Sequence, residues 1–294
     1  MLIFADVMDK VRIYLLALCA AVALGSCDFL ERNKPLVREI GKAVASEIER
    51  NKPSAGSPHA ASAATEADDA LLRQASPEGM PEQMLRRTGY TASYNKATKL
   101  PNWVAWHLTA DRTTGPAKRS GVDFEADTDV PAPRAEDADY YGSGYDRGHM
   151  CPAADNKYSV EAMRESFLFT NMCPQDGGLN RGDWNEMEQA CRRWAQEYGG
   201  VYIVCGPILY KGKQKTIGRK KVTVPEAFFK VVLRMGENPK AIGFIYKNTG
   251  GNRPKGDYVN TVDEVERLTG IDFFPALPDD VEKRVEAEAD IADW

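Results

Sequence analysis

The residues that could do chemistry in this chain are one histidine, one asparagine and a glutamate–arginine pair. The histidine ends the tetrad Asp146–His149, and Asn180, Glu188 and Arg192 follow it. A histidine with a near-neutral pKa can remove a proton from an attacking water. The carboxamide oxygen of an asparagine suits a hard cation such as Mg²⁺, which keeps most of its waters and takes few protein ligands.

Glu188 and Arg192 lie in a segment with the periodicity of a helix. Between residues 183 and 198, apolar side chains recur at steps of three and four residues. Positions four apart share one helix face, so a carboxylate that can hold metal-bound waters and a guanidinium that can bind a phosphate would point into the same space. A base, a hard cation and an arginine are the parts of phosphodiester hydrolysis. The same pair could also be an ordinary surface ion pair.

Signatures of several other enzyme classes are absent from the sequence. It has three histidines and no HExxH metal motif, no GxSxG nucleophile elbow and no Walker-type phosphate loop. His59 lies in an Ala-, Ser- and Pro-rich stretch and His107 in a strand-like run, so a site with two histidine ligands would need a residue from that strand. His149 is therefore the candidate base.

Short apolar runs and helical periods alternate irregularly along the chain. The predicted strands are residues 103–108, 167–170, 201–204, 228–233 and 241–246, and the predicted helices are residues 183–198 and 262–269. Strands on both sides of helices in irregular order predict an α+β fold in one domain, residues 89–278. Residues 28–88 are predicted to form a partly helical, partly flexible tether.

The composition is that of a globular protein. Of 294 residues, 43% are hydrophobic and 28% are charged, which excludes a wholly disordered chain, a collagen and a polytopic membrane protein. The net charge of −5 comes largely from residues 279–294, where seven acids face two bases, and we predict an acidic C-terminal tail there. A basic run from Lys211 to Lys221 is either a solvated loop or a patch that attracts phosphate.

The N-terminus has the features of an export signal. Two basic residues precede an apolar stretch, residues 13–24, that is too short for a stable membrane-spanning helix. Its end, Leu24-Gly25-Ser26-Cys27, resembles the lipobox of bacterial lipoproteins, in which the cysteine is lipidated. We therefore expect a signal peptide over residues 1–27 and an exported protein, lipid-anchored through Cys27 to a bacterial envelope membrane, periplasmic or at the cell surface. The alternatives are an uncleaved anchor and an ordinary secretory signal.

Several segments together resemble the DNA/RNA non-specific endonuclease family. They are DRGHMCPAAD at 146–155, TNMCPQ at 170–175, LNRG-x-W at 179–184, Glu188 with Arg192, and later text at 204–207, 224–230 and 262–274. The resemblance covers about Gly89 to Leu277. It implies a ββα-metal active site and an α+β fold with a central antiparallel sheet flanked by helices.

The resemblance also implies roles for the matching residues. His149 looks like the general base, and Asn180 looks like the one direct protein ligand of Mg²⁺, with Mn²⁺ as an alternative ion. Glu188 looks like the holder of metal-bound waters. The implied activity is hydrolysis of both DNA and RNA, independent of sugar and sequence, with 5′-phosphate ends as products.

The arginines follow from the same resemblance. Arg192 and Arg147 would steady the phosphate and the site. Arg119 resembles the family's upstream arginine, although Lys118 or Arg112 could fill that role because the spacing differs in this region.

Two other functions fit the same residues. The protein could be a catalytically inactive lipoprotein that keeps the fold and binds nucleic acid or envelope components. It could also be an envelope phosphodiesterase for small nucleotides rather than polymers.

The cysteines predict disulfides. Of six, Cys19 would leave with the signal peptide and Cys27 would carry lipid, so an even number remains for an oxidising compartment. Cys151 and Cys173 stand beside family motif positions that a ββα arrangement would bring close, which predicts a disulfide between them. Cys191 with Cys205 would be the second pair.

Overall fold

The computed structural model describes residues 66–210 and 212–294, which belong to one compact unit. The predicted signal peptide, the predicted lipidation site Cys27 and most of the predicted tether lie outside these described residues. Within them, no helix has both the length and the apolar character needed to cross a membrane.

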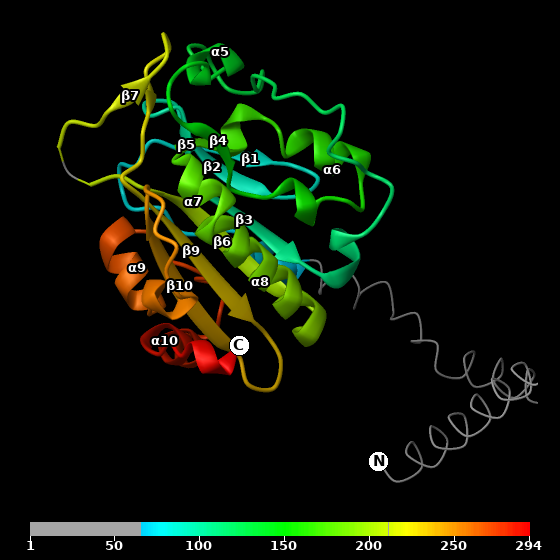
Figure 1. Cartoon of the computed structure of the whole chain (residues 1–294). Helices are drawn as coiled ribbons and strands as arrows, with labels where there is room; N and C mark the ends of the chain where they lie inside the picture. Colours follow the sequence, from blue (N-terminus) through cyan, green and yellow to red (C-terminus); the bar gives the residue numbers. More distant parts are fainter. Residues whose placement is uncertain (1–65, 211) are drawn as a thin grey trace, which may run out of the picture. The chain divides into compact units, whose positions relative to one another are not determined.

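A seven-stranded sheet forms the centre of this unit, in the order β1-β2-β3-β6-β9-β10-β11 (Figure 1). Its strands are β1 (Gln83–Arg86), β2 (Thr91–Asn95), β3 (Leu100–Leu108), β6 (Val201–Ile208), β9 (Ala227–Arg234), β10 (Lys240–Lys247) and β11 (Val259–Asn260). Every neighbouring pair is antiparallel. The predicted α+β class with a central antiparallel sheet is confirmed.

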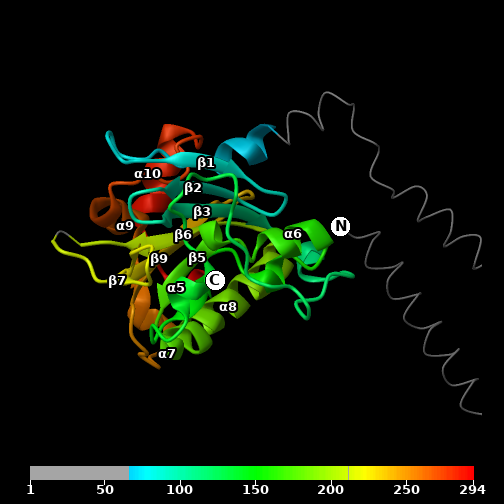
Figure 2. The ribbon, with the colours of Figure 1, turned by 90° about the horizontal axis from the view of Figure 1, so that it is seen from above.

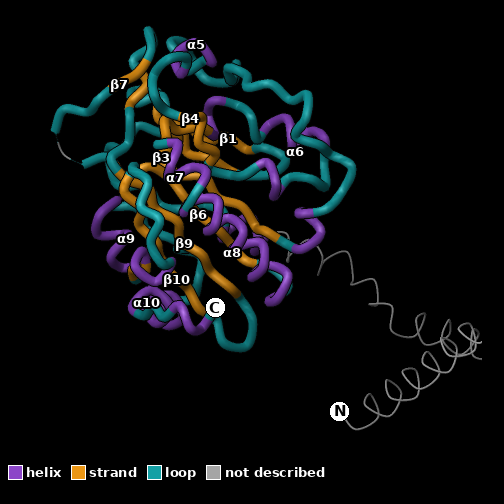
Figure 3. Tube along the Cα trace, in the orientation of Figure 1, coloured by secondary structure: helices purple, strands orange, loops and turns teal. Residues whose placement is uncertain are grey.

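Helices cover both faces of the sheet. They are α5 (Asp137–Tyr140), α6 (Val160–Glu165), α7 (Gly177–Arg181), α8 (Asp183–Tyr198), α9 (Val262–Thr269) and α10 (Asp279–Ala287). Short 3₁₀ turns add η1 (Ala110–Thr113), η2 (Ala153–Asp155), η3 (Phe169–Asn171), η4 (Lys255–Tyr258) and η5 (Ile291–Asp293). Figure 2 shows the sheet between α8 on one side and α9 and α10 on the other, and Figure 3 marks the helices and strands by colour in the orientation of Figure 1.

The two faces of the sheet carry separate hydrophobic clusters because side chains alternate along each strand. Trp106 of β3 packs in one cluster with Trp184 of α8. Its neighbour Ala105 packs in the other cluster with Val265 of α9. The strands are therefore buried on both sides, which explains why they appear in the sequence as nearly continuous apolar runs.

A two-stranded ribbon lies outside the main sheet and carries the tetrad. In this ribbon β4 (Asp146–His149) pairs antiparallel with β5 (Met172–Gln175), and α7 and α8 follow directly. A Cβ on Gly148 would lie 2.4 Å from the side chain of Gln175, so the tetrad needs glycine at this position. Ribbon and helices together make the ββα unit. A second small hairpin joins β7 (Thr216–Ile217) to β8 (Val222–Thr223).

The boundaries of the folded unit differ from the prediction. The segment after Pro278, predicted as an acidic tail, forms α10, where Val285 is buried against the sheet side that α9 also covers. Its high charge conceals one apolar stripe, made by Val281 and Val285 four residues apart. At the other end the sheet starts at Gln83, before the predicted Gly89, because β1 buries only Leu85 and shows little apolar character.

Residues 167–170 also differ from the prediction. They were expected to form a strand, but Phe169–Asn171 is the 3₁₀ turn η3 and the strand begins at Met172. The side chain of Asn171 donates to the carbonyl oxygens of Cys151 and Ser166 (2.9 and 2.8 Å), which stabilises the turn. The apolar run at residues 167–170 therefore indicated burial correctly but did not indicate a strand.

The predicted disulfides are wrong. Cys151, Cys173, Cys191 and Cys205 are all free and buried. In the β4–β5 ribbon, Cys173 stands opposite Gly148 and not Cys151. The Cys151 sulfur instead accepts a hydrogen bond from Asn156 Nδ2 at 3.3 Å. The positions of Cys151 and Cys173 beside the motifs predicted that they lie in the same region of the fold. Those positions did not predict the directions of their side chains.

Candidate active site

A cleft of about 870 Å³ contains all six predicted catalytic and metal-site residues. Its lining includes Arg119, Arg147, His149, Asn180, Glu188 and Arg192. The ribbon supplies two of them, α7 and α8 supply three, and the loop before Phe124 supplies Arg119. Residues widely separated in the sequence therefore converge on one space.

The imidazole of His149 is buried and neutral. Its ring lies edge-on to Phe167, with centroids 5.0 Å apart, and tilted against Phe124 at 5.7 Å. Burial lowers the pKa of His149 to about 3, with Arg119 contributing, so the imidazole is uncharged at neutral pH. Its Nε2 has no hydrogen-bond partner among the described residues. A buried nitrogen without a partner is costly, and at an active site it is available for a substrate or a water.

A hydrogen bond from helix α8 fixes the backbone at the end of β4. The indole nitrogen of Trp184 donates to the carbonyl oxygen of His149 at 3.2 Å, and Trp184 is fully buried. This bond joins α8 to the ribbon. It therefore fixes the position of His149 relative to the helix that carries Glu188 and Arg192.

Asn180 lies near the C-terminal end of the short helix α7 and lines the cleft. The helix is capped by Asp176, whose carboxylate accepts from the backbone N–H groups of Gly178 and Leu179. Asn180 Nδ2 donates to Asp146 Oδ2 at 3.0 Å, and Arg181 donates to the same oxygen at 2.6 Å. No described residue donates to Asn180 Oδ1, so that oxygen can serve a cation.

Glu188 places a carboxylate in the same cleft as Asn180. Burial raises its pKa to about 7, with Asp155 adding to the rise and Lys230 and Arg192 opposing it. Arg192 lies 3.9 Å from Glu188, which confirms that the pair shares one helix face. A partly buried carboxylate and a free carboxamide oxygen that line the same cleft are oxygen donors of the kind a hard divalent cation takes, so the residues fit Mg²⁺.

Two of the arginines differ in how freely they can reach a substrate. Arg147 is partly engaged, because its Nε donates to Asp137 at 2.6 Å and its guanidinium lies over the rings of Phe124 and Tyr140. Arg119 is exposed, with its guanidinium 5.5 Å from the centre of the Phe167 ring.

The two alternatives to Arg119 separate in the structure. Arg112 does not line the cleft; it donates to the carbonyl oxygens of His107 and Gly89 and so has a structural role. Lys118 does line the cleft, next to Arg119.

Two buried charged residues near the cleft, Asp155 and Lys230, were not predicted to belong to the site. Asp155 accepts hydrogen bonds from Arg192 (2.8 Å) and from the indole of Trp106 (3.1 Å). Lys230 is fully buried, with Nζ lying 4.2 Å from the centre of the Trp184 ring and making no hydrogen bond within the described residues. Its signal was visible: a lysine interrupts the apolar run of residues 228–233. For Asp155, the one indication in the sequence was its position at the end of the family-like segment 146–155.

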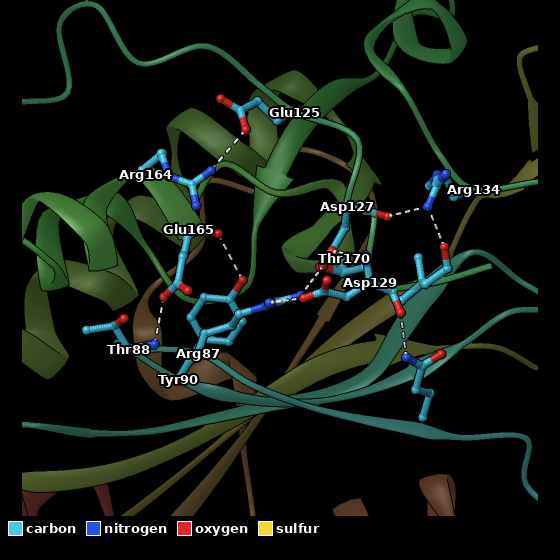
Figure 4. A network of polar contacts seen from close by, with 12 residues as sticks. Arg87, Thr88, Tyr90, Glu125, Asp127, Asp129, Arg134, Arg164, Glu165 and Thr170 are labelled. Atoms are coloured by element: carbon cyan, nitrogen blue, oxygen red, sulfur yellow. Dashed lines mark hydrogen bonds and ion pairs between the residues drawn. The ribbon is translucent and has the colours of Figure 1, made fainter. Parts of the chain in front are cut away.

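A polar network anchors the loop that carries Arg119 and Phe124 (Figure 4). The buried carboxylate of Asp127 pairs with Arg87 at 2.5 Å and accepts from the Thr170 hydroxyl at 2.6 Å. The network therefore joins the loop to Arg87, directly after β1, and to Thr170 of η3.

The sequence pattern of the DNA/RNA non-specific endonuclease family matches residues 68–280. The chain belongs to this family. Among its members, the Xenopus laevis protein named "Nuclease EXOG, mitochondrial" is 37% identical over 207 residues, which are 65% of this chain and 58% of that protein. The protein named "Nuclease" of Nostoc sp. is 34% identical over 220 residues, covering 70% of this chain and 78% of that protein.

A solved structure agrees with the family assignment. A chain in the crystal structure of the EndoG/EndoGI complex matches with a TM-score of 0.65 and 30% sequence identity, covering 67% of this chain and 87% of that chain. The aligned region spans only 56% to 64% of the length of the EXOG proteins from Xenopus laevis, Mus musculus, Homo sapiens and Danio rerio. The family's fold thus accounts for the ββα unit and the sheet behind it.

Proposed function

We propose that the protein is an endonuclease that hydrolyses phosphodiester bonds of DNA and RNA with Mg²⁺, or alternatively Mn²⁺, and leaves 5′-phosphate ends. One observation supports this above all: a neutral histidine with an unpartnered Nε2, a free carboxamide oxygen and a carboxylate–arginine pair line the same cleft. Membership of the endonuclease family gives the same direction.

Each residue has a defined task in this proposal. His149 accepts a proton from the water that attacks phosphorus, since its imidazole is uncharged at neutral pH, while the bond from phosphorus to the 3′ oxygen breaks and that oxygen takes a proton from solvent water. Arg192, Arg147 and Arg119 bind non-bridging phosphate oxygens as charge develops on them. Asn180 would hold the cation directly and Glu188 through its waters. When bound, the cation supplies further stabilisation of negative charge on the phosphate.

Substrate recognition should be independent of sequence. The cleft offers cations to phosphate oxygens, and contacts of that kind position a nucleic acid without reading its bases. We therefore expect cleavage of both DNA and RNA, and weaker binding as salt concentration rises.

A plasmid-nicking and RNA-digestion assay tests the function. The wild-type protein should cut both polymers with Mg²⁺ and neither with EDTA. His149→Ala should lower the rate by about 10² to 10⁴-fold, the usual contribution of a general base, with an unchanged circular dichroism spectrum. His107→Ala is the matched control, because that ring stacks on Tyr202 at 4.2 Å and does not line the cleft. Binding without cleavage by the wild type would favour a binding module, and wild-type cleavage by His149→Ala would remove the histidine's role.

We also propose, from the sequence of residues 13–27 alone, that the protein is exported and lipid-anchored through Cys27. Growth of an expressing bacterium with labelled palmitate should label the protein, and Cys27→Ser should abolish the label. Equal labelling of both forms would contradict the anchor.

A further inference from the structure

We propose that the basic hairpin β7–β8 binds the phosphodiester backbone of the nucleic acid where the strand leaves the cleft. This inference rests on the proposed nuclease function and assigns it a second contact region. We define the hairpin surface as the exposed side chains of Lys213, Lys215, Arg219 and Lys221. Lys211 lies outside the described residues and forms no part of it.

The hairpin is docked on the segment that leads into β4. A Cβ on Gly218 would lie 2.3 Å from the side chain of Asp139, so the turn approaches α5 very closely. The backbone N–H of Lys220 donates to Asp139 Oδ1 at 2.9 Å. Figure 1 shows β7 beside α5, close to the end of the sheet where β4 lies.

One contact joins the hairpin directly to the edge of the cleft. Lys215 Nζ donates to the hydroxyl of Tyr145 at 3.1 Å and lies 4.7 Å from the centre of its ring. Tyr145 immediately precedes Asp146, which lines the cleft. A strand whose scissile phosphate lies at His149 would therefore pass near the hairpin as it extends beyond the ribbon.

The local charge balance leaves this surface positive. The nearby acids already have partners: Lys220 lies 3.6 Å from Glu136, Arg147 lies 2.6 Å from Asp137, and Asp139 accepts from backbone. The four cations of the hairpin surface form no ion pair with any described residue. Unpaired cations on a docked hairpin beside the cleft attract the phosphates of a polyanion and release its counterions.

An exposed aromatic side chain adds to the same region. Tyr141 directly follows α5 as its C-cap residue and is 88% exposed, an unusual exposure for a large hydrophobic residue. Tyrosines at such positions can stack on unpaired bases of any sequence. The hairpin surface and Tyr141 together fit a single-stranded segment, with cations for its backbone and a ring for one base.

A binding experiment separates this proposal from the nuclease function. We would place all variants in the His149→Ala background and titrate a fluorescent 30-nucleotide single-stranded DNA at several salt concentrations. The triple variant Lys213→Gln, Arg219→Gln, Lys221→Gln keeps Lys215 and Lys220, so the docking contacts remain. We expect its Kd to rise about tenfold at low salt, and the slope of log Kd against log salt to fall by about 2, since each lost phosphate contact removes roughly 0.7.

The matched control removes three cations from the far side of the sheet. Arg73, Arg267 and Lys283 are exposed, and their change to Gln leaves the same net charge as the hairpin variant. The control should bind like the parent. If the hairpin variant and the control bind with equal Kd and equal salt slope, the hairpin is not a contact region.

A cleavage experiment with active protein checks the location of the contact. With His149 restored, the hairpin variant should lose about tenfold in kcat/KM on the 30-nucleotide substrate and keep the parent's rate on a dinucleotide-sized phosphodiester, which is too short to reach the hairpin. Equal losses on both substrates would place the effect in the cleft and contradict the proposal. If the parent cuts neither substrate, the nuclease function fails while the binding result still decides the hairpin's role.

Discussion

Groups of neighbouring carboxylates, each with a buried member, occur on both faces of the sheet, and the two groups differ in how their charge is balanced. Beneath the cleft, burial raises the pKa values of Glu188 and Asp155, but Arg192 and Lys230 oppose the rise. On the opposite face, carboxylate oxygens of Asp263, Glu266 and Glu286 lie within 4.8 Å of one another.

The second group has no cation to balance it. Burial raises the pKa of Glu286 to about 8 and that of Glu266 to about 7, and neighbouring acids add to both. No described lysine or arginine pairs with Asp263, Glu266 or Glu286. Burial alone therefore does not decide whether a carboxylate is charged. The acids near the cleft lie close to cations that favour the ionised form, whereas the acids between α9 and α10 have no such cation and bind protons more tightly.

Removing the central cation should produce the largest effect. Lys230 is fully buried beside two tryptophan rings. Burial opposes its charge, but the surrounding thiols and carboxylates raise its pKa overall. Lys230→Met leaves Glu188 and Asp155 with a weaker counter-charge, so we expect a loss of about 3–5 kcal/mol in the free energy of unfolding at pH 8, measured by urea denaturation.

The pH and a matched variant sharpen that result. The loss should shrink below pH 7, because Glu188 can then take up a proton. Lys247→Met, at the exposed end of the neighbouring strand β10, should leave stability unchanged. Wild-type stability of Lys230→Met at pH 8 would show that the cation does not balance the acids.

A smaller effect should follow from neutralising one acid of the same group. Asp155→Asn keeps an acceptor for the indole of Trp106 but replaces the ion pair with Arg192. It also removes one buried negative charge, which limits the cost. We expect a loss of about 1–3 kcal/mol by thermal and urea unfolding, the usual range for a hydrogen bond to a charged group. Asp257→Asn, in the exposed pair with Arg253, is the control. A loss larger than that of Lys230→Met would reverse the proposed order.

The same comparison shows what the sequence could and could not predict. His149, Asn180, Glu188 and Arg192 were predictable because short motifs fix their local geometry and the ββα unit is almost contiguous in the chain. Lys230 comes from a strand far along the sequence and meets the site only through the register of the sheet.

The errors have a related cause. Cys151 and Cys173 are near each other along the motifs, but side-chain direction depends on register and turns that spacing does not specify. The C-terminal segment was predicted as a tail from its summed charge, whereas a few apolar side chains, Val281 and Val285 of α10 among them, pack it against the sheet. Composition thus failed where a single apolar stripe or a single buried charge controls the structure.

The smallest effect should be a gain in stability on the face without cations. Glu286 is 7% exposed and one of its oxygens has no partner among the described residues. With its pKa raised to about 8, the folded state binds a proton more tightly than the unfolded chain, so stability declines as pH rises from about 4.5 through 8. Glu286→Gln removes that charge and should stabilise the protein by about 1–2 kcal/mol at pH 8, less than the full pKa difference because solvent screens part of it.

The gain in stability should disappear near pH 5. At that pH Glu286 is already protonated in the folded protein, so the substitution removes no buried charge. Glu264→Gln makes the same chemical change on α9, but the hydrogen bond from Arg267 lowers the pKa of Glu264 instead of raising it. That variant should therefore show no gain at either pH in thermal unfolding. A gain from Glu286→Gln that persists at pH 5, or an equal gain from Glu264→Gln, would mean that the Gln side chain stabilises the helix for reasons unrelated to buried charge, and the contrast between the two faces would lose its electrostatic basis.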